Sequence, residues 1–213
     1  MPVLPVLTRR TDAGILELRE LRRRDVRAWR EVRARNVAWL SAWEATVPPD
    51  SGEQVPSFGQ MVARFREEGR AGRTIAWAMT LDGRLIGQVT VAGITLGSLR
   101  AASIGYWIDS RVAGRGLTPM AVAMACDHCF TVLRLHRIEI VIRPENAASL
   151  RVVQKLGFRH EGSRPAYLHI DGAWRDHEVF ALNSDEVTAS MTDRLVARHE
   201  SSQTRFPRSQ DPT

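Results

Sequence analysis

The chain contains little cysteine, with only Cys126 and Cys129 among its 213 residues. Two cysteines cannot supply the disulfide framework of a small secreted protein. Their C-x-x-C spacing also occurs in redox and zinc sites, but the pair falls inside an expected helix, and no second cysteine pair could complete a zinc site. We therefore expect two buried or half-buried thiols and no metal site.

Long apolar runs are missing as well. No stretch approaches the roughly 18 to 20 apolar residues of a membrane-spanning helix, and the amino terminus lacks the apolar core and cleavage site of a secretory leader. We expect a cytoplasmic protein without a membrane partner. A length of 213 residues with 44% hydrophobic content predicts one domain with a single large core.

Acidic residues are outnumbered, 24 against 30 lysines and arginines, which gives a net charge of +6. A basic excess permits contact with nucleic acid or a ribonucleoprotein. The densest basic run, 19–35, is interleaved with Leu21, Val26, Trp29 and Val32, which is typical of the solvated face of an amphipathic helix. Because no aromatic stacking platform accompanies this run, sequence-specific nucleic-acid binding is not expected.

Helical and strand periodicities alternate along the chain, which indicates an α/β fold. Asp25 is predicted to cap the first helix, and Asp82-Gly83 favours a type I′ hairpin turn. Expected strands cover 14–21, 74–81, 84–94, 101–109, 137–142, 166–170 and 173–182, and expected helices cover 25–40, 58–68, 118–133 and 147–156. Residues 41–57 are expected to form a loop. Beyond them, 184–213 should be an extension, helical over 185–200 and disordered in its final dozen residues.

The most informative stretch is Gly105–Thr118 (GYWIDSRVAGRGLT), a strand followed by a glycine-bearing loop that opens a helix. A helix N-terminus offers free N–H groups and the positive end of the macrodipole, and it therefore suits an anion. Gly114 and Gly116 permit positive φ and a close approach to a ligand, while Arg111 and Arg115 add positive charge. The loop lacks both the Walker ending and the three-glycine dinucleotide fingerprint. It predicts a phosphate-binding loop of another kind.

The pattern RVAGRG (111–116) resembles the acetyl-coenzyme A loop of the GNAT superfamily of N-acetyltransferases, where backbone amides hold the pyrophosphate. NAAS (146–149) and KLGF (155–158) fit the same superfamily. YLHIDGAWRDH (167–177) is similar to the carboxy-terminal hairpin of its RimJ/RimL branch, and of RimJ in particular, as is NVAWLSAWE (36–44). The resemblance covers residues 12–183.

This resemblance implies a GNAT domain over 12–183, a single mixed, mostly antiparallel twisted sheet flanked by helices, with splayed central strands. It implies acetyl-CoA as cosubstrate and no metal. The residues expected to bind acetyl-CoA are Trp107, Ile108, Asp109, Arg111, Gly114, Arg115, Gly116, Leu117, Thr118, Asn146 and Ser149.

The implied reaction is direct attack of an amine on the thioester, with positioning and backbone hydrogen bonds to the developing oxyanion supplying much of the acceleration. By carry-over from RimL-like enzymes, Ser149 is the expected acid, and the alternative is that it only caps its helix. The glutamate that serves those enzymes as base falls where this chain has Leu168. Glu44 is the first candidate for the base, and water relayed to solvent is its rival.

The residues expected to contact the acceptor are Asn36, Trp43, Glu44, Tyr106 and Tyr167. For Tyr106, Tyr167 and His169 a packing role is an equal alternative, and Asp176 and His177 are expected to fix the hairpin. The resemblance implies acetylation of the N-terminal α-amino group of a ribosomal or other cytoplasmic protein that begins with Ala or Ser. Acetylation of an antibiotic or polyamine, and a non-catalytic module that binds acetyl-CoA or the ribosome, remain open, as does a homodimer.

Overall fold

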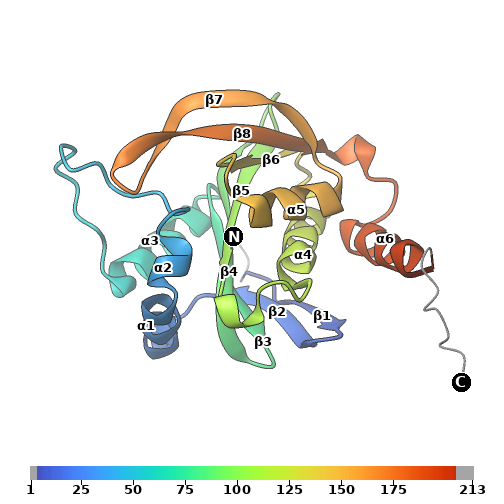
Figure 1. The fold of residues 1–213 in the computed structure, drawn as a ribbon, viewed down its shortest axis with the longest axis horizontal. Coiled ribbons are helices and arrows are strands. Elements are labelled where there is room, and N and C mark those ends of the chain that lie inside the picture. Colours follow the sequence, from blue (N-terminus) through green and yellow to red (C-terminus); the bar gives the residue numbers. More distant parts are fainter. Residues whose placement is uncertain (1–3, 205–213) are drawn as a thin grey trace, which may run out of the picture.

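A computed structural model describes residues 4–204 of the chain, and side chains as far as residue 197. Its strands form one eight-stranded sheet in the order β1-β2-β3-β4-β5-β6-β8-β7 (Figure 1). The strands are β1 (Leu7–Thr11), β2 (Gly14–Glu20), β3 (Ile75–Leu81), β4 (Arg84–Thr95), β5 (Ala101–Ile108), β6 (Arg137–Ile142), β7 (Arg159–Ile170) and β8 (Ala173–Asn183). Within this part of the chain β5 and β6 are parallel and every other strand pair is antiparallel. The expected mixed, mostly antiparallel sheet is confirmed.

Helices cover both faces of the sheet, and the β7–β8 hairpin arches over one end of the molecule (Figure 1). One face carries α1 (Val26–Arg35), α2 (Val37–Leu40) and α3 (Phe58–Arg70), and the other carries α4 (Leu117–Thr131) and α5 (Ala147–Leu156). The face toward α1, α2 and α3 is called the α1–α3 face below.

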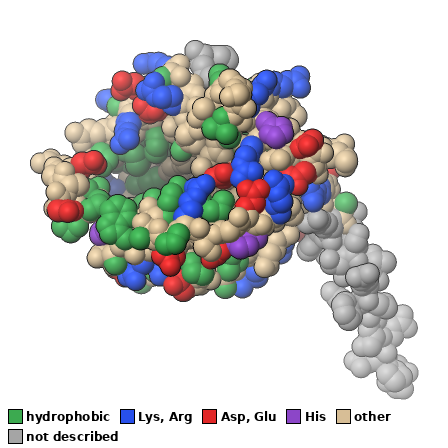
Figure 2. All heavy atoms as spheres, turned by 90° about the horizontal axis from the view of Figure 1, so that it is seen from above, with side chains coloured by type: hydrophobic (Ala, Val, Ile, Leu, Met, Phe, Trp, Pro, Cys, Tyr) green, Lys and Arg blue, Asp and Glu red, His purple; other side chains and the backbone are tan. Residues whose placement is uncertain are grey.

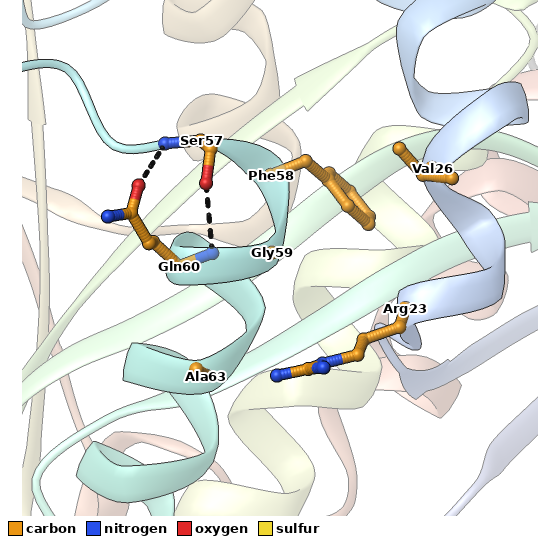
Figure 3. A pocket seen from close by; sticks show the side chains of 7 residues that line it. All are labelled: Arg23, Val26, Ser57, Phe58, Gly59, Gln60 and Ala63. Atoms are coloured by element: carbon orange, nitrogen blue, oxygen red, sulfur yellow. Dashed lines mark hydrogen bonds between the residues drawn. The ribbon is translucent and has the colours of Figure 1, made fainter.

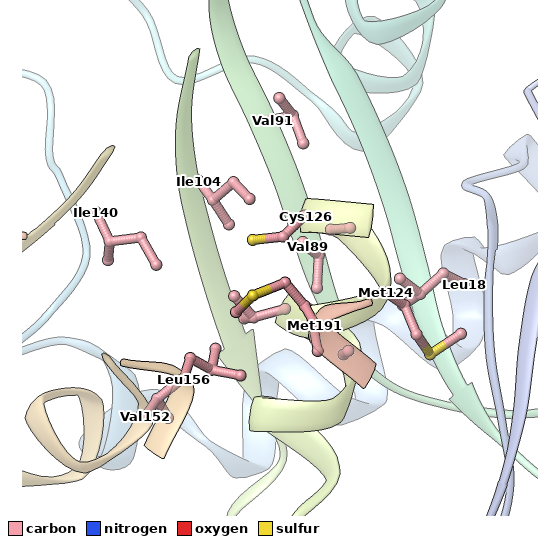
Figure 4. Packing of buried hydrophobic residues seen from close by; sticks show 14 of the residues in the cluster. Leu18, Val89, Val91, Ile104, Met124, Cys126, Ile140, Val152, Leu156 and Met191 are labelled. Carbon is pink, nitrogen blue, oxygen red and sulfur yellow. The ribbon is translucent and has the colours of Figure 1, made fainter. Parts of the chain in front are cut away.

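The main core fills the space between the sheet and helices α4 and α5 (Figure 4). In β6 the residues Ile138, Ile140 and Ile142 point into this core, as the period-two alternation of a strand requires. A smaller cluster of Leu21, Val62, Ala78 and Leu85 lies under α1 and α3. Each such fully buried aliphatic side chain contributes about 1.5–3 kcal/mol, so the sheet that positions the site is firmly supported on both faces.

The helix expected over 25–40 is interrupted at Asn36, whose φ of −110° and ψ of 14° are not helical. Asp25 is the N-cap residue of α1, as expected, but its side chain makes no cap hydrogen bond there. The carboxylate instead accepts from the backbone N–H of Arg22 and the guanidinium of Arg19. Burial alone raises the pKa of Asp25, but these hydrogen bonds and the charge of Arg19 hold it below its usual value. Asp25 therefore ties the helix start to β2.

Two strand boundaries also differ from expectation. β1, which was not expected, pairs with β2 along the edge of the sheet, so the sheet begins at Leu7. β7 begins at Arg159, well before residue 166, and its pairing with β8 shifts register between Arg164 and Leu168. Ala166 has a φ of 47° there. The hairpin turn at Asp82-Gly83 agrees with its prediction, since both residues have positive φ.

The C-terminal extension begins with a short 3-10 turn, and α6 (Met191–Thr204) starts at Met191 instead of Asp185. Met191 is fully buried in the main core, and the Asp127 carboxylate accepts from the backbone N–H groups of Met191 and Thr192. The start of the extension is therefore packed onto the domain. The predicted disorder concerns residues 202–213, of which 205–213 lie outside the described residues.

Candidate functional site

The glycine loop takes the geometry that an anion cradle requires. Gly114 and Gly116 have φ of 80° and 76°, and Gly116 is the N-cap of α4. The first turn of α4 contains no acidic residue, and both glycines and the side chains of Arg111 and Arg115 are exposed. The amides of Leu117 and Thr118 begin the helix, where N–H groups have no intrahelical acceptor. Backbone donors, the helix dipole and two arginines thus converge where the sequence predicted a phosphate site.

The strand that leads into this loop separates from its neighbour. β5 and β6 are paired at Ala101↔Arg137, Ala102↔Ile138 and Ser103↔Glu139, and no pairing follows among their later residues. The backbone of β5 from Tyr106 to Ile108 therefore faces a gap beside β6. The expected splayed central strands are confirmed, and the gap opens toward the glycine loop.

Asn146 and Ser149 lie at the start of α5, on the side of this gap that β6 forms. Asn146 is the N-cap, and its Oδ1 accepts from the backbone N–H of Ser149 at 3.0 Å. The alternative in which the Ser149 hydroxyl caps the helix does not hold, because Asn146 fills that role. Ser149 is half-buried, and its carbonyl accepts from the hydroxyl of Tyr106 at 3.5 Å.

Tyr106 packs against the main core on the α4–α5 side of the sheet, whereas its neighbour Trp107 points to the α1–α3 face. Burial raises the pKa of the Tyr106 phenol. The prediction that Tyr106 lines the acceptor slot together with Trp43 is therefore not matched. The structure instead places its hydroxyl between β5 and α5, beside the splayed strands.

Asn36 and Asp109 form a buried polar bridge between the α1–α2 junction and the end of β5. Asn36 Nδ2 donates to Asp109 Oδ1 at 2.8 Å and to the carbonyl of Val32 at 2.8 Å, and Asn36 Oδ1 accepts from the backbone N–H of Ser110 at 3.0 Å. Arg35 donates two hydrogen bonds to Asp109 Oδ2. Burial raises the pKa of Asp109, but the hydrogen bonds from Arg35 and Asn36 hold it below its usual value.

Asn36 is 0% exposed and Asp109 is 3% exposed. The expected acceptor contact of Asn36 is thus wrong in this structure. The Asp109 carboxylate accepts from Arg35, from Asn36 and, at 3.3 Å, from the backbone N–H of Arg111 at the start of the glycine loop. Both residues fix the loop's starting point. The helix break at Asn36 and the strand end at Asp109 are 73 residues apart in the sequence and meet only in the folded chain.

The loop after α2 is fastened at three places. The carboxylate of Glu44 accepts from both terminal nitrogens of Arg33, whose guanidinium lies 5.3 Å from the centroid of the Trp107 ring. Arg143 donates to the carbonyl of Ala42 at 2.7 Å, and its guanidinium lies 5.5 Å from the ring of Trp43. These contacts place Glu44 beside β5 and Trp43 beside the end of β6.

The third attachment joins this loop to the β7–β8 hairpin. Ala45 makes a β-bridge to Ile170, and the backbone N–H of Thr46 donates to the carbonyl of His169 at 2.8 Å. The Thr46 hydroxyl lies 2.7 Å from Nδ1 of His169. His169 therefore holds the loop and hairpin together, in agreement with the packing alternative.

The hairpin carries a further cluster on the α1–α3 face. Arg164 donates to the hydroxyl of Tyr167 at 3.2 Å and to Oε2 of Glu139 at 3.0 Å, and the Tyr167 ring stands edge-on to His177 at 5.7 Å. Glu139 also accepts from Arg137. Burial raises the pKa of Glu139, but the two arginines keep it below its usual value. Sequence reasoning missed Glu139 because its second partner, Arg164, lies 25 residues away in the chain and is brought to it only by the pairing of β6, β8 and β7.

Seen from the hairpin side, the surface mixes basic and acidic side chains, and a hollow floored by hydrophobic side chains opens beside them (Figure 2). The charged part includes an ion-pair network over β6, β7 and the start of the extension. Its members are Arg137, Glu139, Arg159, Glu161, Arg164 and Glu186. The arginines and carboxylates neutralise one another, so this face carries no single-sign patch.

Cys126 and Cys129 are buried, free thiols within α4. Figure 4 shows Cys126 among the core side chains. Burial raises the pKa of both, that of Cys129 to about 12. The expectation of two buried thiols is confirmed. In the part of the chain that the structure describes, no group of three His, Cys, Asp or Glu could hold a metal ion.

A surface cavity of about 430 Å³ lies at the start of α3, away from the glycine loop (Figure 3). Two of its lining residues, Ser57 and Gln60, bind each other in a reciprocal capping box, and Arg23 is its charged lining residue. No helix within residues 4–204 is long and apolar enough to cross a membrane.

Comparisons with known proteins agree with this geometry. Residues 16–159 match the family described as "Acetyltransferase (GNAT) domain". The structure of Mycobacterium smegmatis RimJ in complex with CoA-disulfide superposes with a TM-score of 0.85 at 40% identity, covering 91% of this chain and 94% of that one. The [ribosomal protein uS5]-alanine N-acetyltransferase of Escherichia coli is 31% identical over 76% of this chain and 84% of its own length. The "Probable N-acetyltransferase YjcK" of Bacillus subtilis is 43% identical over 49% of this chain, a match that spans 59% of that protein.

Proposed function

Because this chain belongs to the GNAT family of acetyltransferases, we propose that it transfers an acetyl group from acetyl-CoA to the N-terminal α-amino group of a protein. The observation that carries the proposal is the exposed glycine loop at the start of α4, reached along a strand that has separated from its neighbour. When bound, the cosubstrate supplies an activated acetyl thioester. The remaining chemistry belongs to the residues of this chain.

The loop fits the cosubstrate because its backbone is open to a pyrophosphate. A Cβ at Gly114 or Gly116 would meet nothing within 4 Å. Glycine is therefore needed at these positions for the positive φ and not because a neighbour packs too closely for a side chain. Arg111 and Arg115 would pair with phosphate oxygens. The side of β5 that faces the gap near Trp107 and Ile108, with Asn146 across the gap, would hold the pantetheine arm.

The acceptor would lie on the α1–α3 face, between the loop carrying Trp43 and Glu44 and the hairpin carrying Tyr167. Tyr167 is 37% exposed and can contact a ligand. Ser149, at the start of α5, would hydrogen-bond the leaving thiolate. Glu44 keeps the loop in place through Arg33, and both of its oxygens are engaged by that partner.

This arrangement favours a protein N-terminus over a polyamine. A polyamine site needs carboxylates that are free to pair with several ammonium groups. The carboxylates of Glu44 and Glu139 on this face are each bound by arginines. The resemblance to the RimJ/RimL branch and the E. coli relative's action on a ribosomal protein support an Ala- or Ser-starting ribosomal protein as acceptor. A cytoplasmic site of action is part of the same proposal.

The test is release of CoA thiol from acetyl-CoA with a panel of acceptors. It would compare Ala- and Ser-starting ribosomal peptides, their amino-blocked copies, lysine peptides, spermidine and aminoglycosides. We expect turnover with free peptide amino termini and none with the blocked copies. Turnover with a small amine alone would replace the proposed acceptor, and acetyl-CoA binding without turnover on any acceptor would indicate a non-catalytic module. Gly116→Glu, which fills the loop, should abolish both binding and turnover.

A further inference from the structure

The acceptor amine must lose a proton before it can attack, because only the neutral amine is nucleophilic. Glu44 and Glu139, two carboxylates on the α1–α3 face, are both bound by arginines: Glu44 by two nitrogens of Arg33, and Glu139 by Arg137 and Arg164. These arginines stabilise the charged form of the two carboxylates and make them poorer proton acceptors. A side chain on this face whose lone pair has no hydrogen-bond partner is a better candidate.

His177 lies on the same face. In β8 it is opposite Arg164 of β7, and two residues further along Val179 is opposite Val141 of β6. Residues opposite each other across strands, and residues two apart along one strand, share a face. His177 therefore lies on the face that also carries Glu139 and Trp107, next to the end of β6.

Contacts already described connect the splayed end of β5 to this part of β8. The Arg33 guanidinium lies over the Trp107 ring and binds Glu44, and the Arg143 guanidinium lies over the ring of Trp43, the neighbour of Glu44. Arg143 is the first residue beyond the end of β6, whose last paired residue, Ile142, is opposite Glu178. His177 precedes Glu178, and its ring contacts that of Tyr167. The splayed end of β5 and His177 therefore lie on one face of the sheet, on either side of the end of β6.

The tautomer of His177 is fixed by its surroundings. Nδ1 lies 3.0 Å from the carbonyl oxygen of Arg175. A carbonyl can only accept, so Nδ1 carries the proton and Nε2 of the neutral ring carries a lone pair. No hydrogen bond joins Nε2 to another residue of 4–204. His177 is 3% exposed, and its Nε2 is not among the sealed polar side-chain atoms without a partner, which in this part of the chain belong to Thr80, Gln88 and Asn183.

We propose that Nε2 of His177 is the proton acceptor for the acceptor ammonium, a role that rests on the acetyl transfer proposed above. The ammonium N–H bond breaks, its electron pair stays on nitrogen, and a new N–H bond forms at Nε2. His177 becomes an imidazolium whose Nδ1–H still donates to the Arg175 carbonyl, and it later returns the proton to solvent. The second proton, lost as the amide forms, matches the one that the leaving thiolate takes up.

Charged and titratable groups surround His177 on this face. Arg164 and Tyr167 face it from β7, and Arg143 follows the adjoining end of β6, where Glu139 binds Arg164. Arg175 lies two residues before His177 in β8, and its guanidinium donates to the carbonyls of Ile170 and Asp171. Its chain neighbours are engaged away from it: Asp176 accepts from the backbone N–H of Ala166, and Glu178 binds His160 and Ser163. Substituting His177 therefore tests whether the loss of activity at low pH comes from His177 and not from Asp176 or Glu178.

The experiment compares His177→Asn with His160→Gln. In His177→Asn the amide nitrogen can reproduce the Nδ1 bond to Arg175, while nothing replaces Nε2. We expect kcat with the active amine to fall by about 100-fold or more, the range of general-base contributions, with unchanged acetyl-CoA affinity by calorimetry. The acid limb of the pH–rate profile should be lost. His160→Gln, an exposed histidine on the opposite face of β7, should behave as the unchanged chain.

Two outcomes would overturn the proposal. One is a His177→Asn variant that keeps the acid limb and most of kcat, and the other is a nitrogen-15 NMR spectrum of the unchanged protein that shows the proton on Nε2. The NMR reading needs no variant and stands even if His177→Asn does not fold. Failure of the proposed function is distinct, because it appears as absence of peptide turnover in the unchanged protein. If a different amine is active, the same comparison is made with that amine.

Discussion

Replacing Asn36 by Leu should destabilise the fold and weaken acetyl-CoA binding together. Leu has a similar volume but cannot make the three hydrogen bonds of Asn36: to the Val32 carbonyl, to Asp109 Oδ1, and from the N–H of Ser110. A neutral hydrogen bond contributes about 0.5–1.5 kcal/mol, and one to a charged group about 1.5–3 kcal/mol. The free energy of unfolding should therefore fall by about 3–5 kcal/mol.

The effect on the cosubstrate follows from the position of Ser110. Its N–H is held by Asn36 at the point where β5 ends and the glycine loop begins. Without that anchor the loop must be ordered by the ligand itself. We expect the dissociation constant of acetyl-CoA to rise about tenfold, which corresponds to 1.4 kcal/mol.

Urea denaturation measures the first effect and calorimetric titration of acetyl-CoA the second. Ser57→Ala is the matched control, since it removes an exposed N-cap of α3, far from the loop. That variant should lose about 1 kcal/mol and bind acetyl-CoA normally. If Asn36→Leu loses no more stability than the control, or loses stability with unchanged affinity, the bridge does not connect the helix junction to the loop as described.

Three further outcomes are expected. Gly87→Ala would place a Cβ 2.3 Å from the carbonyl oxygen of Trp107, so β5 must shift and the unfolding free energy should fall by about 1–3 kcal/mol; an unchanged urea midpoint would contradict this contact. The pKa of Asp109 is lowered in the folded state, so its carboxylate stabilises the fold at a pH above the unfolded pKa, and this contribution is lost as the pH falls toward the folded pKa. Asp109→Asn should therefore flatten the acid side of a plot of unfolding free energy against pH. An unchanged slope there would refute the assignment. Because burial raises the pKa of Cys126 and Cys129 and removes them from solvent, a disulfide reagent should label them only at the rate of unfolding, whereas rapid labelling of the native protein would show that α4 opens.

Local patterns in the sequence were enough to predict most of the sheet. β6 and α5 lie where their periodicities placed them, and the Asp82-Gly83 turn has the positive φ values that its residues favour. The same holds for the glycine loop, since Gly114 and Gly116 sit directly between a strand and a helix. Backbone propensity and amphipathic alternation act over a few residues, so they can be read without knowing the rest of the fold.

The boundaries that local patterns missed are those set by distant contacts. No glycine or proline marks the helix break at Asn36. The helix is interrupted there because Asn36 binds Asp109, 73 residues later in the chain. β7 begins at Arg159 instead of residue 166 because its backbone pairs with β8. Its first residues are polar and show no strand-like alternation, so the sequence alone did not predict this part of the strand. Tertiary pairing overrides weak local preference in both cases.

The sequence by itself determined the alternation of strands and helices, the burial of the two cysteines and the glycine loop between β5 and α4. Tertiary structure alone decided which polar groups are free. Glu44 could be named from its neighbours, but only the fold shows that Arg33 engages both of its oxygens. His177 was expected merely to fix the hairpin, and only the fold shows one ring nitrogen bound and the other without a partner among the described residues. Hydrogen-bond partners many residues apart are chosen by packing, and the chemistry of a side chain depends on which of its lone pairs those partners leave open.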